Sequence, residues 1–277
     1  MTTIVAMYSR LNPFRILRRT VYSLRWHWIS GAPKARARKS KAKSKGRLAR
    51  WQRNIKWGIR IALLLLALDI FYIMTIWPNW SDFKRGPVAK SEFIKLYQGK
   101  HRSDPSLPRL RWQAVPLAKI SSHMQRAVIV AEDARFYQHS GFDVIALKDA
   151  MDYNLEQLKM KYGASTISQQ TVKNMFFSAS RNPLRKWHEL IFTVSMEFFV
   201  PKDRILETYL NIAEFGKGIF GVEAASRYYW GIPASKLSLK QATELAATLP
   251  SPKKHNPKTR TDYFTRRSAK IYRHMQY

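Results

Sequence analysis

Residues 57–77 read WGIRIALLLLALDIFYIMTIW, and this stretch decides the broad class of the protein. As an α-helix its 21 residues rise about 31 Å, close to the hydrocarbon thickness of a bilayer. Trp57 and Trp77 bracket it as interfacial aromatics do. Arg60 lies near one end and can reach the interface, whereas Asp69 lies mid-span and is expected to face a partner helix or a hydrated spot. We predict a transmembrane helix over 57–77 rather than a buried core helix, because nothing before it could bury it.

Basic residues are concentrated before this helix. The chain carries 49 Lys+Arg against 18 Asp+Glu, a formal charge of +31, and residues 1–58 hold 16 of the basic residues and no acid. Lys and Arg favour the cytoplasmic side, so 1–56 is predicted to be a basic cytoplasmic tail and the C-terminal part to lie in the periplasm. The helix is too long and too far from the N-terminus for a cleaved signal peptide, which indicates an uncleaved single-pass anchor.

The tail itself has two interpretations. Its position beside the transmembrane helix favours contact with lipid headgroups over nucleic acid, for which the tail has no recognition motif. Residues 11–29 place apolar side chains at steps of three and four between arginines, which fits either a basic amphipathic helix on the inner leaflet or a poorly ordered tail.

Composition excludes several classes of protein. The chain has no Cys, which rules out disulfide scaffolds, Cys-ligated zinc and thiol catalysis. Hydrophobic residues at 45% are too many for a largely disordered chain. The basic body with its still more basic tail indicates acidic partners, which are nucleic acid, anionic lipid or phosphate-bearing substrates.

Beyond the membrane segment the pattern is helical. Residues 78–114 are rich in Pro, Lys and Arg and are interpreted as a linker or membrane-docking segment, followed by one domain over 115–277. Apolar residues in that domain recur with helical spacing, and few runs alternate with period two, so we predict a mostly α fold. The expected helices cover residues 120–134, 142–160, 166–177, 184–200, 201–215 and 237–249.

The first candidate for chemistry is a pair of adjacent carboxylates, Glu132 and Asp133, at the end of an apolar run. Desolvation at such a position can raise a carboxyl pKa into the range of a general acid or base. The alternative is a structural role, in which either carboxylate pairs with Arg135 or caps a loop.

The second candidate is the start of the next helix. Thr166 and Gln169 form a capping-box pattern, and Gln169 and Gln170 can share a face with Lys173. A helix N-terminus with a lysine one turn in favours an anion. An ordinary capped helix with a solvated polar face is the alternative.

The third candidate is a basic segment that contains one carboxylate, with Lys186 and Glu189 three residues apart on an otherwise apolar helix. Glu189 could hold a metal or a cationic partner near a phosphate, or form a surface ion pair of little energetic weight.

The segment 202–211 is interpreted chiefly as core packing. The G-x-G-x-x-G match at 216–221 follows a helix rather than a strand, so a dinucleotide site is excluded on context.

Taken in order, these stretches resemble the signature motifs of glycosyltransferase family 51, the peptidoglycan glycosyltransferases. The pattern Glu-Asp-x-x-Phe-x-x-His-x-Gly appears as Glu132, Asp133, Phe136, His139 and Gly141. The pattern Gly-Gly-Ser-Thr-Ile-Thr-Gln-Gln appears over 163–170, with Ala164 and Ser168 as departures. Arg-Lys-x-x-Glu appears as Arg185, Lys186 and Glu189, and Lys-x-x-Ile-Leu-Glu-x-Tyr-Leu-Asn as Lys202, Ile205, Leu206, Glu207, Tyr209, Leu210 and Asn211. The resemblance covers about residues 115–253. It includes no transpeptidase domain, so it points to the monofunctional members of the family. The long basic N-terminus is the main departure from the family pattern.

The resemblance implies a lysozyme-like, two-lobed, mostly α domain that polymerises lipid II into linear β-1,4 glycan strands for cell-wall biosynthesis. The 4-hydroxyl of the acceptor GlcNAc attacks C1 of the donor MurNAc with inversion, and undecaprenyl diphosphate leaves. Glu132 is implied as the general base, and Glu189 as the residue that places the diphosphate. The residues implied to bind diphosphate and sugar are Gln169, Gln170, Lys173, Arg181 and Lys186. Those implied to support the motifs are Asp133, Phe136, His139, Ser165, Thr166, Arg185 and Asn211.

The resemblance also implies partners and a location. No covalently bound cofactor is expected, and Mg²⁺ or Mn²⁺ on Glu189 is the candidate metal. Expected partners are lipid II, the growing glycan strand, membrane lipids and other wall-synthesis or division proteins, with no nucleic acid. The expected location is the inner membrane. Three alternatives stay open: a lytic glycosidase on the same fold, a non-catalytic membrane scaffold and a membrane-tethered nucleic-acid binder. Lys173, Arg181 and Lys186 argue against the first, and the intact Glu132/Glu189 pair argues against the second. The third is opposed because the basic tail would lie across the membrane from the folded domain and no base-stacking motif is visible.

Overall fold

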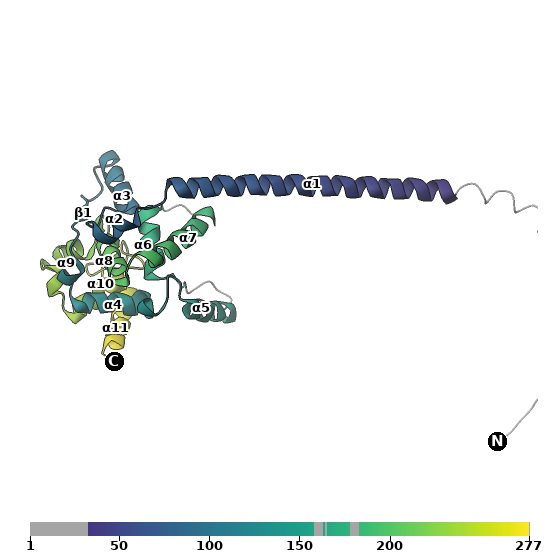
Figure 1. Cartoon of the computed structure of the whole chain (residues 1–277). Coiled ribbons are helices and arrows are strands. Elements are labelled where there is room, and N and C mark those ends of the chain that lie inside the picture. The colour runs from purple at the N-terminus through teal and green to yellow at the C-terminus, as the bar shows by residue number, and fades with distance from the viewer. Residues whose placement is uncertain (1–32, 158–162, 164, 178–182, 277) are drawn as a thin grey trace, which may run out of the picture. The chain divides into compact units, whose positions relative to one another are not determined.

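The computed structural model describes residues 33–157, 163, 165–177 and 183–276. The chain divides into two compact units, Met1–Ile76 and Trp77–Tyr277. Within the described part of the first unit lies one long helix, α1 (Pro33–Thr75), drawn in purple and blue in Figure 1. The part from Gly46 to Thr75 is long and apolar enough to cross a membrane, by length and composition. Helix α1 therefore supports a single-pass membrane anchor.

The bounds of α1 differ from those expected for the membrane segment. The helix begins at Pro33, inside the basic region, and ends at Thr75, so that Trp77 lies beyond it. The amphipathic helix considered for residues 11–29 lies outside the described residues.

The second unit is mostly helical, which confirms the predicted fold class. Its α-helices are α2 (Trp80–Arg85), α3 (Glu92–Ser103), α4 (Ser122–Glu132), α5 (Val144–Glu156), α6 (Ile167–Phe176), α7 (Pro183–Phe199), α8 (Lys202–Ile212), α9 (Val222–Trp230), α10 (Leu239–Thr248) and α11 (Asp262–Met275). Short 3₁₀ turns lie at Leu117–Lys119, Phe136–Gln138 and Ala234–Lys236. Three short strands, β1 (Arg111–Trp112), β2 (Glu214–Gly216) and β3 (Ile219–Phe220), form a sheet in the order β1-β3-β2, with β1 parallel and β2 antiparallel to β3.

The interpretation of 78–114 as a linker is wrong. Helix α3 begins after Ser91, whose hydroxyl accepts a hydrogen bond from the backbone N–H of Ile94. Ile94 and Tyr97 are buried in one cluster with Ile212 from the end of α8. Apolar residues one turn apart therefore make this segment part of the folded unit; its docking to a membrane stays a prediction.

The predicted helices of the C-terminal domain correspond to α4 through α8 and α10. The clearest confirmation is the start of α6, where the Thr166 hydroxyl accepts from the Gln169 N–H at 3.2 Å and the Gln169 side-chain oxygen accepts from the Thr166 N–H at 3.1 Å. Helices α2, α3 and α11 were not predicted. In α11 the buried residues Phe264 and Ile271 stand among Lys and Arg, which hides the apolar stripe.

Two groups of helices build the unit. Helices α4, α10 and α11 pack against one another, and α6 packs against both α7 and α8 (Figure 1). Asn211, at the end of the buried face of α8, ties an additional segment to this core: its side chain accepts from the backbone N–H of Val115 at 2.8 Å and donates to the Val115 carbonyl at 2.9 Å. The C-terminal end of α4 lies where the two groups meet, because Glu132 contacts both α6 and α11.

A glycine is required where the sheet leads into α9. Gly221 has φ +80° and ψ 148°, and a Cβ placed there would lie 2.6 Å from the carbonyl oxygen of Asn211. That backbone region is open essentially to glycine alone.

We therefore expect Gly221→Ala to lower the free energy of unfolding by about 3 kcal/mol, through backbone strain and the forced movement of α8 from α9. Gly99→Ala is the matched control, because Gly99 lies within α3 and a Cβ there meets nothing within 4 Å. This control substitution should raise the free energy of unfolding by roughly 0.5–1 kcal/mol. Urea unfolding of the detergent-solubilised chain, followed by tryptophan fluorescence, measures both. Equal stabilities of the two variants would contradict the expectation.

Candidate active site

Glu132 is the last residue of α4, and its carboxylate is held from two sides. Oε2 accepts from the Gln170 side-chain amide at 3.0 Å, and Oε1 accepts from the Arg267 guanidinium at 2.8 Å. The side chain is 13% exposed. Burial raises the pKa of the Glu132 carboxyl above its ordinary value, while the hydrogen bond from Gln170 and the charge of Arg267 act in the opposite direction. These contacts fit a buried carboxylate that can take up a proton during a reaction.

Arg267 is a site residue that the motifs did not indicate. It lies on α11, far beyond Glu132 in the sequence, and its Nη2 also donates to the Ala131 carbonyl at 3.2 Å. The guanidinium therefore binds the end of α4 and the carboxylate of its last residue together. The only sequence signal for Arg267 is the run of basic residues near the C-terminus. No pattern in the sequence indicates that its partner is Glu132.

Gln170 links the carboxylate to the core of the protein. Its side-chain oxygen accepts a hydrogen bond from the hydroxyl of Tyr209 at 3.1 Å, and Tyr209 is buried on α8. Because Tyr209 fixes the orientation of the Gln170 amide, the NH₂ group faces Glu132. Gln169, by contrast, uses its side-chain oxygen to cap α6. Their predicted contacts with sugar and phosphate stay predictions.

Asp133, next to Glu132, has structural partners. Its Oδ1 lies 2.9 Å from Nε2 of His139, and its Oδ2 accepts from the backbone N–H of Ile167 at 2.9 Å. Because Nδ1 of His139 accepts from the Gly141 N–H at 3.2 Å, the proton of a neutral ring belongs on Nε2 and is donated to Asp133. The two adjacent carboxylates are thus separated by their surroundings: Asp133 joins the first motif to the N-terminus of α6.

Other residues of the predicted motifs also help to join the first motif to the N-terminus of α6. Thr166 donates from its hydroxyl to the Gly141 carbonyl at 2.6 Å, and Phe136 is fully buried with Nζ of Lys202 4.4 Å above its ring. A Cβ on Gly141 would lie 2.9 Å from a methyl group of Thr193, and its φ is +97°, which explains the glycine in the motif.

A second carboxylate, Glu189 on α7, lies in a cationic cluster. Arg185 forms a close ion pair with its Oε1, and Nζ of Lys186 lies 3.3 Å from its Oε2. Burial is the main cause that lowers the pKa of Lys173, and the charges of Arg185 and Lys186 add to it, whereas Glu189 and Glu132 act in the opposite direction. Lys173 is therefore within electrostatic reach of both carboxylates. Arg181 lies outside the described residues.

The candidate metal ligand does not make a cation site by itself. Both carboxylate oxygens of Glu189 are engaged by Arg185 and Lys186. In the described part of the chain, no group of three or more His, Cys, Asp or Glu side chains is placed to hold an ion. A site of this composition carries its positive charge on Lys and Arg side chains, which suit phosphate oxygens.

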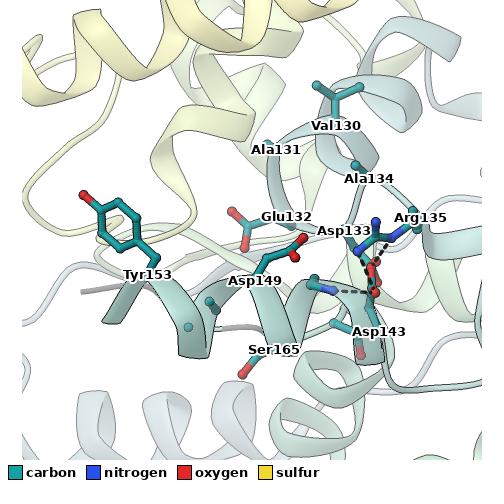
Figure 2. A pocket seen from close by; sticks show the side chains of 14 residues that line it. Val130, Ala131, Glu132, Asp133, Ala134, Arg135, Asp143, Asp149, Tyr153 and Ser165 are labelled. Atoms are coloured by element: carbon teal, nitrogen blue, oxygen red, sulfur yellow. Dashed lines mark hydrogen bonds and ion pairs between the residues drawn. The ribbon is translucent and has the colours of Figure 1, made fainter. Parts of the chain in front are cut away.

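A cavity of about 540 Å³ opens beside Glu132 (Figure 2). Residues 130–135 at the end of α4 form one wall, α5 forms another, and Ser165 and Thr166 border it at the start of α6. Lys173, Lys186 and Glu189 are not among the described residues that line it. The structure thus divides the region into a cavity on the Glu132 side and a cationic cluster on the Glu189 side.

This arrangement is a mostly α domain in which a largely buried carboxylate lines a cavity and lies within electrostatic reach of a phosphate-compatible cluster, and it fits a glycosyl-transferring enzyme. The family model described as Transglycosylase matches residues 105–276, and the chain belongs to this family. The match agrees with the lysozyme-like fold expected from the sequence.

Curated relatives define the family more closely. The biosynthetic peptidoglycan transglycosylase of Laribacter hongkongensis is 37% identical over 223 residues, which are 80% of this chain and 98% of the relative. That of Nitrosomonas eutropha is 42% identical over 198 residues, 71% of this chain and 81% of the relative. That of Bordetella pertussis is 37% identical over 241 residues, 84% of this chain and 97% of the relative. The chain belongs to the biosynthetic peptidoglycan transglycosylases, which confirms the predicted family and enzyme class.

Proposed function

We propose that the chain polymerises lipid II into linear β-1,4 glycan strands, releasing undecaprenyl diphosphate and inverting C1 of the donor MurNAc. The observation that carries the proposal is the pairing of a buried carboxylate, Glu132, with a neighbouring cluster of Lys and Arg around Glu189. Glycosyl transfer from a lipid diphosphate needs both a base for the acceptor hydroxyl and positive charge for the leaving diphosphate.

In the proposed reaction Glu132 accepts the proton of the acceptor GlcNAc 4-hydroxyl. The hydroxyl oxygen then bonds to C1 of the donor MurNAc, and the electron pair of the C1–O bond leaves with the diphosphate. Arg267 and Gln170 hold the Glu132 carboxylate in place for this transfer. The protonated carboxyl is stabilised by the same burial that raises its pKa, so the proton is retained until it is released to water.

The cationic cluster is proposed to stabilise the departing diphosphate. Charge on the phosphate oxygens rises as the C1–O bond breaks, and fixed cations near them act most strongly in a partly buried site. The support for this role is that Lys186 forms an ion pair with Glu189 and that Lys173 is within its electrostatic reach; the negative charge of Glu189 also offsets part of the repulsion among the cations. The same role for Arg181, which is to stabilise the diphosphate, stays a prediction. A divalent cation would need the substrate phosphates as additional ligands.

The polymerisation proposal is tested with labelled lipid II and the purified full-length chain in detergent. A ladder of lysozyme-sensitive products on a gel is the expected result. Shortening of added glycan strands would instead indicate a lytic enzyme, and a well-folded chain that produces neither would indicate a scaffold.

For the membrane we propose an inner-membrane protein with a cytoplasmic N-terminus and a periplasmic domain. The support is the apolar helix within α1 and the excess of Lys and Arg before it. Since the chain has no Cys, single cysteines report topology cleanly. In intact cells with a permeabilised outer membrane, a membrane-impermeant maleimide should label Ser106→Cys but not Ala49→Cys. The reverse pattern would contradict the orientation.

A further inference from the structure

The cavity beside Glu132 has a wall that no sequence motif includes. Four residues of α5 line it, Ala146, Asp149, Ala150 and Tyr153. Their spacing of three, four and seven residues places them on one face of the helix. Figure 2 shows Asp149 and Tyr153 extending from α5 toward the side on which the Glu132 carboxylate lies.

The position of this face is fixed against Glu132. Asp143 caps α5 by accepting a hydrogen bond from the Ala146 N–H at 2.9 Å. The Arg135 guanidinium donates two hydrogen bonds, of 2.8 and 2.9 Å, to the same carboxylate. Arg135 follows Glu132 by three residues. The forked ion pair therefore sets where α5 starts relative to the end of α4.

Burial in the core does not account for the polar residues on this face. None of the residues of α5 is buried in the protein. Of its five strongly exposed large apolar residues, all but Ile145 follow a different stripe of the helix: Val144, Leu147, Met151 and Leu155. The side that carries Asp149 and Tyr153 borders the cavity instead, and small alanines between them leave the cavity open.

The chemistry of the cavity identifies its occupant, given the polymerisation proposed above, on which this inference rests. The donor diphosphate belongs with Lys173 and Lys186, which are not among the described residues lining the cavity. The hydroxyl that Glu132 deprotonates must lie within hydrogen-bond reach of it, inside the cavity. An acidic side chain and a phenol ring suit a pyranose sugar, whose hydroxyl and amide N–H groups donate hydrogen bonds and whose ring face is apolar.

We infer that the inward face of α5 is a binding wall for the acceptor sugar, with Asp149 accepting hydrogen bonds from an N-acetylated hexose and Tyr153 packing against its ring. Both residues bind and position the acceptor so that its 4-hydroxyl faces Glu132. They take no part in binding the donor diphosphate.

The test separates acceptor from donor with two probes. The acceptor probe is the methyl glycoside of the GlcNAc–MurNAc disaccharide, which has the 4-hydroxyl but no leaving group. The donor probe is lipid II with its GlcNAc 4-hydroxyl blocked. Asp149→Asn and Tyr153→Leu should each raise the KM for the acceptor probe about tenfold and leave the KM for the donor probe within about twofold. Asp152→Asn is the matched control, an exposed aspartate on the same helix that does not line the cavity, and should change neither value.

Direct titration of the acceptor probe against the full-length chain in detergent gives a second arm that needs no turnover. Weaker binding to the Asp149 and Tyr153 variants than to the wild type supports the subsite even if lipid II is not polymerised, which would count against the proposed function alone. Unchanged acceptor binding in both variants, or equal rises in donor and acceptor KM, would overturn the inference.

Discussion

Glu132→Gln is expected to reduce polymerisation of lipid II about 10³-fold while the protein stays folded. The amide cannot take up the proton of the acceptor hydroxyl. The glutamine amide can keep the contacts of the carboxylate. Its oxygen can accept a hydrogen bond from Arg267, and its NH₂ can donate to the side-chain oxygen of Gln170 if the Gln170 amide is rotated by 180°. The Tyr209 hydroxyl then accepts a hydrogen bond from Gln170 instead of donating one. The loss should therefore appear in turnover rather than in stability. A gel of labelled glycan products, run beside the wild type, measures it.

Two controls separate chemistry from folding in that experiment. The Glu132→Gln variant should bind a diphosphate-bearing donor analogue with the wild-type Kd, because the cationic cluster around Glu189 is untouched. Glu156→Gln, an exposed glutamate at the end of α5, should polymerise at the wild-type rate. Near-normal glycan strands from Glu132→Gln would remove Glu132 as the base.

Arg267→Ala is expected to lower polymerisation at neutral pH about 10²-fold and to shift its dependence on pH. The charge and the hydrogen bond of Arg267 both favour the ionised form of Glu132, so their loss raises the Glu132 pKa further above its ordinary value. A general base works deprotonated, and kcat/KM rises with pH through its pKa. The acidic limb of the profile should therefore move to higher pH, and the loss should shrink as the pH rises.

The pH profile distinguishes this effect from structural damage. A variant that merely loosened α11 would lose activity at all pH values alike. Arg267→Lys, which keeps the charge but not the planar guanidinium, should show a smaller shift. Arg266→Ala, next to it and exposed, should leave the profile unchanged. An unshifted acidic limb in Arg267→Ala would rule out this role for Arg267.

The neighbouring carboxylates Glu132 and Asp133 show where sequence reasoning stops. Both follow the same apolar run, and their spacing and composition do not separate them. In the fold both residues line the cavity, but Asp133 is engaged by His139 and the N-terminus of α6, whereas Glu132 is engaged by Gln170 and Arg267. The family resemblance indicated Glu132 as the base, and exposure gives a physical reason why Asp133 is less suited to that role: its side chain is 1% exposed, against 13% for Glu132.

Features that depend on neighbours within a few residues could be predicted from the sequence. A long apolar run gave a helix able to cross a membrane, helical spacing gave the mostly α domain, and Thr166 with Gln169 gave a capping box that the structure confirms. These features rest on hydrogen bonds and periodicity inside one turn or one helix, which the linear order of residues encodes directly.

Which distant segments meet follows from tertiary packing and could not be predicted from the sequence. This packing placed Arg267 of α11 on Glu132 of α4, folded the supposed linker 78–114 into the core, and set the inner face of α5 against the cavity. Each of these contacts joins side chains whose separation along the chain follows no period. Their meeting depends on how several helices pack at once, a property of the whole buried core that no local pattern carries.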